Sequence, residues 1–163
     1  MGDLVHLTFG PRRGLRRATS ALVWYERGCA LEASDPDAAI AAYRRAIAGR
    51  PDLADAHNNL GRLLHDRGEL ALAEDHYRRA AAADGTVALY AYNLGVALED
   101  QGRAVEAIMA YEQALELDPR LADAHFNLAR QIELAARSAG DDLMLRRAVR
   151  HLLSYRQLAR VTG

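Results

Sequence analysis

The chain has 163 residues, half of them hydrophobic, which fits one domain with a continuous core. Its formal net charge of −1 argues against a general nucleic-acid or membrane-surface binder. Only 6% of the residues are aromatic, which favours closely packed helices over a β-sandwich or barrel. No apolar run approaches the length that a transmembrane helix needs.

Residues 1–18 stand apart in composition. They contain four arginines and one aspartate, a formal charge of +3, and Gly10 with Pro11 ends any regular structure begun before them. The prediction over residues 1–18 is a basic, disordered leader. Two alternatives stay open: a short basic arm for an acidic partner, and the remnant of a domain joined upstream.

Cysteine and arginine usage bear on compartment and source. The single cysteine, Cys29, cannot form an internal disulfide, and the leader places its arginines after its apolar residues, the reverse of a secretory signal. We therefore expect a cytoplasmic location. All 21 basic residues are arginine, which we take as a sign of a GC-rich bacterial genome.

Residues 19–51 predict a helix, a short turn and a second helix. Asp35 followed by Pro36 is a favourable helix start, because aspartate caps the helix and proline suits its first turn.

Residues 52–86 predict a helical hairpin. In residues 55–67 the apolar side chains recur on one side of a helix, and Gly68 suits a left-handed C-cap. In the hairpin Gly61 allows the helices to approach closely and Tyr77 fills the remaining space. Gly85 follows where this second helix ends, so the exit is expected to depend on glycine.

Residues 87–120 repeat this hairpin at a constant interval in sequence. The same interval separates six pairs of landmarks: Leu60 and Leu94, Gly61 and Gly95, Gly68 and Gly102, Ala73 and Ala107, Tyr77 and Tyr111, and Ala80 and Ala114. A fixed period of this size indicates stacked supersecondary units, because one hairpin cannot bury its own apolar face.

Residues 121–160 begin as a fourth copy and then depart from it. The interval from Ala129 to Ala148 is longer by seven than the matching interval from Gly95 to Ala107 in the preceding copy. We expect about two extra turns on the first helix, residues 122–138, before Gly140 ends it. The arginine-rich last helix, residues 141–160, is interpreted as a capping helix, with Asp141 and Asp142 at its start.

These residues resemble the tetratricopeptide repeat (TPR), most closely Leu60, Gly61, Leu64, Gly68, Ala73, Tyr77, Ala80, Leu94, Gly95, Leu98, Gly102, Ala107, Tyr111, Ala114 and Pro119. The resemblance covers about residues 21–160. It implies an all-α fold, a right-handed α-solenoid of stacked antiparallel helix pairs in a domain spanning 19–163. The four repeats would lie at about 19–51, 52–86, 87–120 and 121–160, with an atypical C-terminal capping pair.

Catalytic and metal-binding motifs are absent from the sequence. It has no glycine-rich phosphate loop, GxSxG, HExxH or CxxC. His57 and His125 are separated by twice the repeat interval, so we interpret them as packing residues. Cys29 is expected to be a buried or half-buried, inert thiol. We therefore expect no enzymatic activity and no cofactor or metal.

In the family that the sequence resembles, the first helix of each pair lines a concave groove. The predicted peptide-binding groove consists of Tyr25, Asn58, Asn59, Arg62, Tyr92, Asn93, Val96, Phe126, Asn127 and Arg130. The carboxylate clamp of chaperone-binding repeats is not expected, because Tyr25, Cys29, Leu89 and Tyr92 occupy positions where that clamp needs basic residues.

Asn59, Asn93 and Asn127 recur at the repeat interval, and asparagine offers both donors and an acceptor to a peptide backbone. This is similar to the asparagine ladder of O-GlcNAc transferases, although Glu26 takes the place in the first repeat. The alternative is that asparagine is only a consensus residue here. Rings and arginines along the same line are typical of protein-binding hot spots.

The sequence thus predicts a non-catalytic scaffold that binds an extended peptide or a helix of another protein. Two alternatives stay open: the repeat region of a bacterial transcription regulator, or that of a glycosyltransferase, in each case with its other domain absent.

Overall fold

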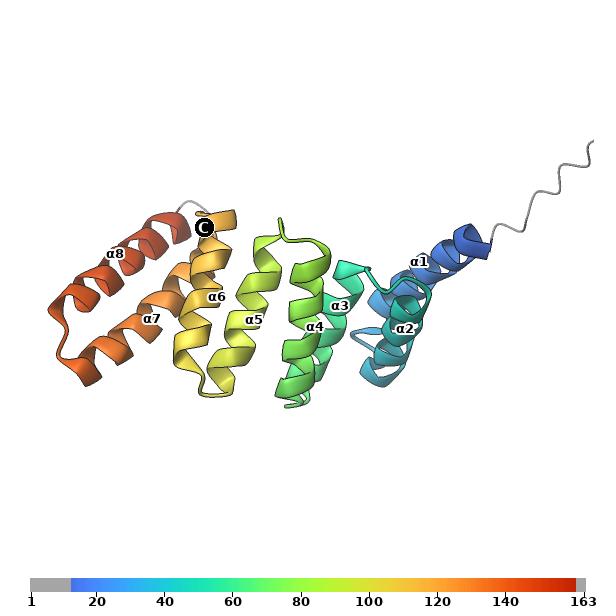
Figure 1. The fold of residues 1–163 in the computed structure, drawn as a ribbon, viewed down its shortest axis with the longest axis horizontal. Coiled ribbons are helices and arrows are strands. Elements are labelled where there is room, and N and C mark those ends of the chain that lie inside the picture. The colour runs from blue at the N-terminus through green and yellow to red at the C-terminus, as the bar shows by residue number, and fades with distance from the viewer. Residues whose placement is uncertain (1–12, 161–163) are drawn as a thin grey trace, which may run out of the picture. The chain divides into compact units, whose positions relative to one another are not determined.

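The computed structural model describes residues 13–160, which form eight α-helices and no strand (Figure 1). The helices are α1 (Arg13–Leu31), α2 (Pro36–Gly49), α3 (Ala54–Asp66), α4 (Leu70–Ala83), α5 (Ala88–Asp100), α6 (Ala104–Leu117), α7 (Ala122–Ala139) and α8 (Asp142–Ala159). The expected all-α fold of paired helices is confirmed.

The chain divides into two compact units, Met1–Pro51 and Asp52–Gly163, and each is described by itself. Residues 1–12 of the predicted leader lie outside the described residues. The remainder of that stretch belongs to α1, which begins at Arg13, six residues before the predicted start of the domain at residue 19.

Unit 1 contains the helix pair α1 and α2. The Asp35 carboxylate accepts a hydrogen bond from the backbone nitrogen of Ala38 at 3.0 Å, and Pro36 occupies the first turn, as predicted. The core centres on Tyr43, which is fully buried against Gly28. A Cβ atom at Gly28 would lie 2.6 Å from Cε1 of Tyr43, so only glycine leaves room for the ring.

Unit 2 contains three helix pairs, α3/α4, α5/α6 and α7/α8, which follow one another along the chain (Figure 1). Each helix packs on its partner, α4 also packs on α5, and α6 packs on α7. The first helices α3 and α5 are in contact as well. Two of the pairs repeat the glycine–tyrosine contact of unit 1. A Cβ at Gly61 would lie 2.9 Å from Tyr77, and one at Gly95 would lie 2.6 Å from Tyr111.

The turns inside the pairs of unit 2 require glycine for its backbone conformation. Gly68, Gly102 and Gly140 have φ values of +77°, +73° and +67°, which other residues rarely adopt. The left-handed conformation expected of Gly68 is therefore confirmed, and Gly140 ends α7 in the same conformation.

The exit from α4 differs from the prediction. Gly85 does not have a positive φ, and Asp84 leaves the helix in an extended conformation. The Asp84 carboxylate accepts hydrogen bonds from the backbone nitrogen and the hydroxyl of Thr86, at 3.0 and 2.6 Å. The prediction that this exit depends on glycine is wrong, because an extended backbone with an aspartate side chain completes the turn.

The last pair is longer than the others, as its spacing predicts. α7 has 18 residues where α3 and α5 have 13 each. The Asp141 carboxylate caps α8 by accepting from the backbone nitrogens of Leu143 and Met144, at 2.9 and 3.1 Å. The predicted helix start at Asp141 is thus confirmed.

Candidate functional site

Successive first helices of unit 2 are joined by side-chain hydrogen bonds. The Tyr90 hydroxyl donates to the Asp55 carboxylate at 2.6 Å, and the Asn93 amide donates to the Asn58 carbonyl oxygen at 2.8 Å. The partners in each bond are 35 residues apart in sequence, one more than the repeat interval. Each bond therefore joins successive first helices with a shift of one residue between equivalent positions. These bonds fix the spacing of the face that the predicted groove residues occupy.

The asparagines of α3 differ in exposure. Asn58 is only 6% exposed, and its amide also donates to the carbonyl oxygen of Asn59 at 3.2 Å. Asn58 therefore offers little surface to a ligand and instead links Asn59 to Asn93. Asn59 and Asn93 are half-buried and remain at the surface.

Asn59, Asn93 and Asn127 are called the asparagine row below. A hydrogen bond from this row also joins α5 to α7. The Asn127 amide donates to the Tyr92 hydroxyl at 3.3 Å, and the Tyr92 ring packs at 5.9 Å from the ring of Tyr111. Burial raises the pKa of Tyr92, so its hydroxyl stays protonated at neutral pH. The equivalent ring on α7, Phe126, is 42% exposed and lies 5.2 Å from the ring of Tyr155 on α8.

The remaining predicted groove residues of unit 2 are two arginines and a valine. Arg62 lies 3.5 Å from the Asp66 carboxylate on its own helix. Arg130 of α7 forms an ion pair with Glu99 of α5, a further link between neighbouring first helices. Val96 is half-buried and packs against the core shared by α5 to α8.

In unit 1 the predicted groove residue Tyr25 is half-buried, with its ring 5.9 Å from that of Tyr43. Cys29 is exposed, so the prediction of a buried or half-buried thiol is wrong. Gly28 is buried, and the rotation of about 100° per residue places Cys29 on the exposed side of α1. The Tyr43 hydroxyl donates to the Glu32 carboxylate at 2.5 Å, and its oxygen lies 3.3 Å from the Cys29 sulfur.

Histidines pair across two of the hairpins, a contact that the sequence pattern alone did not suggest. Nδ1 of His57 lies 2.9 Å from Nδ1 of His76, and Nδ1 of His125 lies 2.9 Å from Nδ1 of His151. The partners are 19 and 26 residues apart in sequence. The difference of seven equals the extra length between Ala129 and Ala148 in the last repeat, so the two histidine pairs occupy equivalent positions. This match in spacing is the sequence signal that could have revealed the pairs. His57 is fully buried, and both pairs join a first helix to its second helix.

A buried carboxylate lies between the second and third repeats. Glu74 of α4 is 6% exposed and accepts hydrogen bonds from Gln101 and from Arg103, at 2.8 and 2.7 Å. Burial acts to raise its pKa, but these bonds and the nearby Arg78 outweigh burial and lower it. The carboxylate is therefore charged at neutral pH and ties α4 to the turn after α5.

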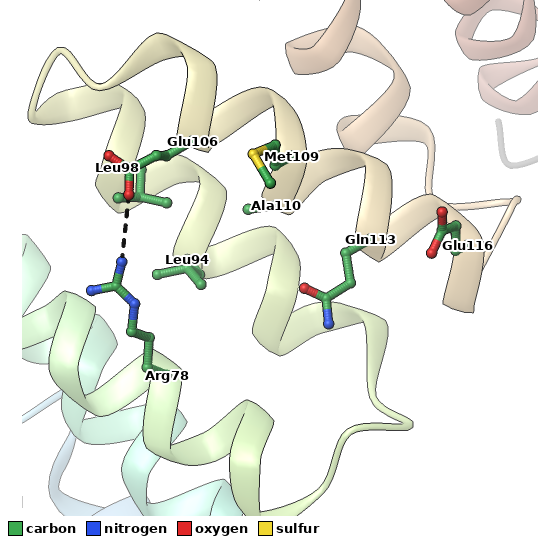
Figure 2. Close-up of a pocket in the computed structure, with 8 residues that line it drawn as sticks. All are labelled: Arg78, Leu94, Leu98, Glu106, Met109, Ala110, Gln113 and Glu116. Carbon is green, nitrogen blue, oxygen red and sulfur yellow. Dashed lines mark ion pairs between the residues drawn. The ribbon is translucent and has the colours of Figure 1, made fainter.

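The side of α5 opposite the groove residues carries a shallow hollow of about 470 Å³. Figure 2 shows Leu94 and Leu98 of α5 between Arg78 of α4 and the side chains of α6. Arg78 lies 3.7 Å from Glu106, and this ion pair spans α4 and α6. Leu94 and Leu98 face away from Tyr92 and Asn93 by the helical period, so the hollow is a separate surface.

Two features are absent from the described residues. Residues 13–160 contain no group of three or more histidine, cysteine or acidic side chains that could hold a metal ion. Among the described helices, none combines the length and the apolar character of a membrane-spanning segment.

The fold and the recurring contacts define a helical repeat protein built from successive, equivalent hairpins. Family models of the tetratricopeptide repeat match residues 30–88 and 100–130, together more than half of the chain. The chain belongs to the tetratricopeptide repeat family.

Solved structures of the same fold are numerous. A crystal structure of MamA is 21% identical with a TM-score of 0.76, covering 91% of this chain and 84% of MamA. The first TPR of Spaghetti (RPAP3), bound to an HSP90 peptide, is 24% identical with a TM-score of 0.70, covering 73% of this chain and 95% of that one. The Arabidopsis OM64 TPR domain is 22% identical with a TM-score of 0.69, covering 72% of this chain and 98% of that domain. No curated protein sequence matches the chain significantly.

Proposed function

We propose that this protein is a non-catalytic interaction scaffold whose first helices bind an extended peptide or a helix of a partner protein. In unit 2 the binding face consists of Asn59, Arg62, Tyr92, Asn93, Val96, Phe126, Asn127 and Arg130, and Asn58 holds Asn59 and Asn93 in position. In unit 1, Tyr25 occupies the position that is equivalent to Tyr92 and Phe126 in unit 2.

The proposal rests on the side-chain amides of Asn93 and Asn127, whose nitrogens are held by hydrogen bonds while their carbonyl oxygens accept none from a described residue. Each donates to a residue of the preceding first helix, and neither carbonyl oxygen accepts a hydrogen bond within the described residues. No fully buried side-chain polar atom of this part lacks a partner, so these two oxygens keep some exposure to solvent. Two acceptors at equivalent positions on adjacent helices suit the regular N–H groups of a bound peptide.

Apolar and charged side chains border this row. Phe126 offers an exposed ring beside Asn127, and Arg130 follows one turn later on the same helix. Rings and arginines contribute most of the binding energy in many protein interfaces. The structural neighbour bound to an HSP90 peptide supports the proposal, because paired helices of this kind hold a peptide in that complex.

The experiment compares binding with stability in a triple variant, Asn59→Ala, Asn93→Ala and Asn127→Ala. The partner is first captured with the intact protein from the native cell, and its binding segment is mapped. We expect the triple variant to weaken binding of that segment about tenfold or more, because each lost amide removes contacts to the ligand. The free energy of unfolding, measured by urea unfolding, should fall by less than the free energy of binding, since the amides are half-buried.

A matched control replaces the exposed residues Val105 and Met109 with glutamine, both on α6, which carries none of the binding-face residues. This control should leave binding unchanged. A triple asparagine variant that loses stability but keeps its affinity would assign the row to packing alone and contradict the proposal.

A further inference from the structure

The outer side of α8 corresponds to the surface on which each preceding repeat receives the next. Ala73, Ala107 and Ala148 are the equivalent small residues of α4, α6 and α8, all buried. In this alignment Leu153 of α8 occupies the position that Arg78 holds in α4.

Charged pairs mark that surface on the earlier repeats. Arg78 of α4 pairs with Glu106 of α6, as Figure 2 shows. One repeat later the signs are exchanged: Glu112 of α6, equivalent to Arg78, pairs with Arg147 of α8, equivalent to Glu106. Leu153 is the third member of this series, and it has no following repeat within the described residues.

Exposure follows the same order. Glu74 of α4 is 6% exposed, and its equivalent Ile108 on α6 is half-buried against the core that includes residues of α7. The equivalent on α8 is Val149, which is 54% exposed, and Leu153 is 56% exposed. The surface that is covered on α4 and α6 is therefore open on α8.

Positive charge surrounds the open surface. Two hollows of about 410 and 600 Å³ follow α8, and their lining includes Arg146, Arg150, Arg156 and Arg160. None of these four arginines forms an ion pair with a described residue, and the only acidic residue lining either hollow is Asp142. An apolar strip with unpaired arginines beside it is complementary to a helix that is apolar on one side and acidic at its margins.

We propose that the outer face of α8, formed by Leu145, Val149, Leu153 and the four arginines, binds an acidic amphipathic helix of another protein. This helix lies where the first helix of a further repeat would pack. The first helices already present define its apolar residues, because they place Leu94 and Leu98 in α5, and Leu128 and Ile132 in α7, four residues apart. The site is separate from the asparagine row.

Charge argues against a second copy of this chain as the occupant. The described helix that would continue such a stack is α1, whose sequence contains four arginines and one glutamate. A helix with this excess of arginine does not complement the arginines beside the open face of α8. The geometry also favours a helix over a lipid surface, because the same face on α4 and α6 receives a helix.

The test uses a fluorescent peptide with the sequence of α7, Ala122–Ala139, carrying Arg130→Glu and Arg137→Glu and held helical by a hydrocarbon staple. Its binding to the full chain is measured by fluorescence anisotropy at low and high salt. We expect binding that weakens as salt rises. The peptide of natural sequence should bind about tenfold more weakly, because it keeps both arginines.

Variants of the protein locate the binding. Val149→Gln with Leu153→Gln should weaken binding about tenfold or more, and the exposure of both residues leaves the fold intact. Arg150→Gln with Arg156→Gln should remove the preference for the acidic peptide. The control, Val105→Gln with Leu134→Gln, changes two exposed apolar residues elsewhere and should bind normally.

Four outcomes would overturn the proposal. The first is that the acidic peptide does not bind, and the second is that both peptides bind equally. The third is that binding of the acidic peptide survives Val149→Gln with Leu153→Gln. The fourth is that the intact protein binds phosphatidylglycerol vesicles, or forms a dimer in sedimentation, and that this double variant abolishes it. That result would assign the face to a membrane or to a second copy.

Discussion

The middle pair α5/α6 and the last pair α7/α8 solve the same packing problem with different residues. In the middle pair Gly95 makes room for Tyr111, which fills the space between the helices. In the last pair the equivalent positions in the sequence hold Ala129, which is fully buried, and Leu152, which is half-buried. We expect the small and the large position to be coupled, because two closely packed helices leave a limited volume between them.

The largest expected effect comes from breaking the contact of the middle pair. Gly95→Leu should destabilise the protein by about 3 kcal/mol, because even a Cβ there would lie 2.6 Å from the Tyr111 ring. Urea unfolding measures the change. An unchanged unfolding midpoint would contradict the packing of these helices.

A double-mutant cycle sharpens the same comparison. Gly95→Ala and Tyr111→Leu together convert the middle pair to the residues of the last pair. The two changes should be less harmful together than the sum of the single effects, with a coupling of about 1 kcal/mol. Strict additivity would show that the two positions do not share one space.

The next effect concerns how repeats are joined. Glu74→Ala should destabilise by about 2 kcal/mol, because it leaves Gln101 and Arg103 without their buried acceptor. Glu106→Ala, which removes a more exposed carboxylate that pairs with Arg78 and Arg103, should lower the free energy of unfolding clearly less. Urea unfolding of both variants measures the difference. Equal losses in the two variants would mean that burial of Glu74 does not matter.

The smallest effect depends on pH and distinguishes the last pair. Burial, together with His125, Arg147 and Arg150, lowers the pKa of His151 from 6.5 to about 4. His125 donates from Nε2 to the carbonyl oxygen of Pro119, so its Nδ1 accepts from His151. The facing carboxylates of α6 are those of Glu112 and Glu116, which line the same hollow as His151.

The lowered pKa fixes the sign of the effect. Between pH 6.5 and about 4 the unfolded chain binds a proton at this histidine that the folded chain does not. The contribution of His151 to the free energy of unfolding is therefore fully present above this window and is lost as the pH falls through it. The half-exposed ring is screened by solvent, so the contribution is about 1 kcal/mol. His151→Gln should flatten the unfolding free energy over this range, and an unaltered pH profile would contradict the assignment.

Much of the fold could be predicted because packing positions recur at a fixed interval. The landmarks that share this interval, such as Gly61, Tyr77 and Ala80, are the residues on which the helices meet. The longer interval before Ala148 predicted the long α7 for the same reason. These are local patterns, and a single sequence displays them.

The errors and omissions involve residues whose surroundings a local pattern does not reveal. Glu74 looks like an ordinary helix-surface acid until the turn after α5 covers it. Asn58 is buried because Asn93 of the next helix bonds to it. The general preference of cysteine places Cys29 in the interior, although its position beside Gly28 turns it outward.

The most direct test of the proposed scaffold is photo-crosslinking in the native cell. A photoreactive residue is placed in turn at Asn59, Asn93 and Asn127, and at Val105 and Met109 as controls outside the asparagine row. We expect all three asparagine positions to crosslink to one and the same partner, and the two control positions not to crosslink to it. Crosslinks to that partner from Val105 and Met109, with none from the asparagine row, would contradict it.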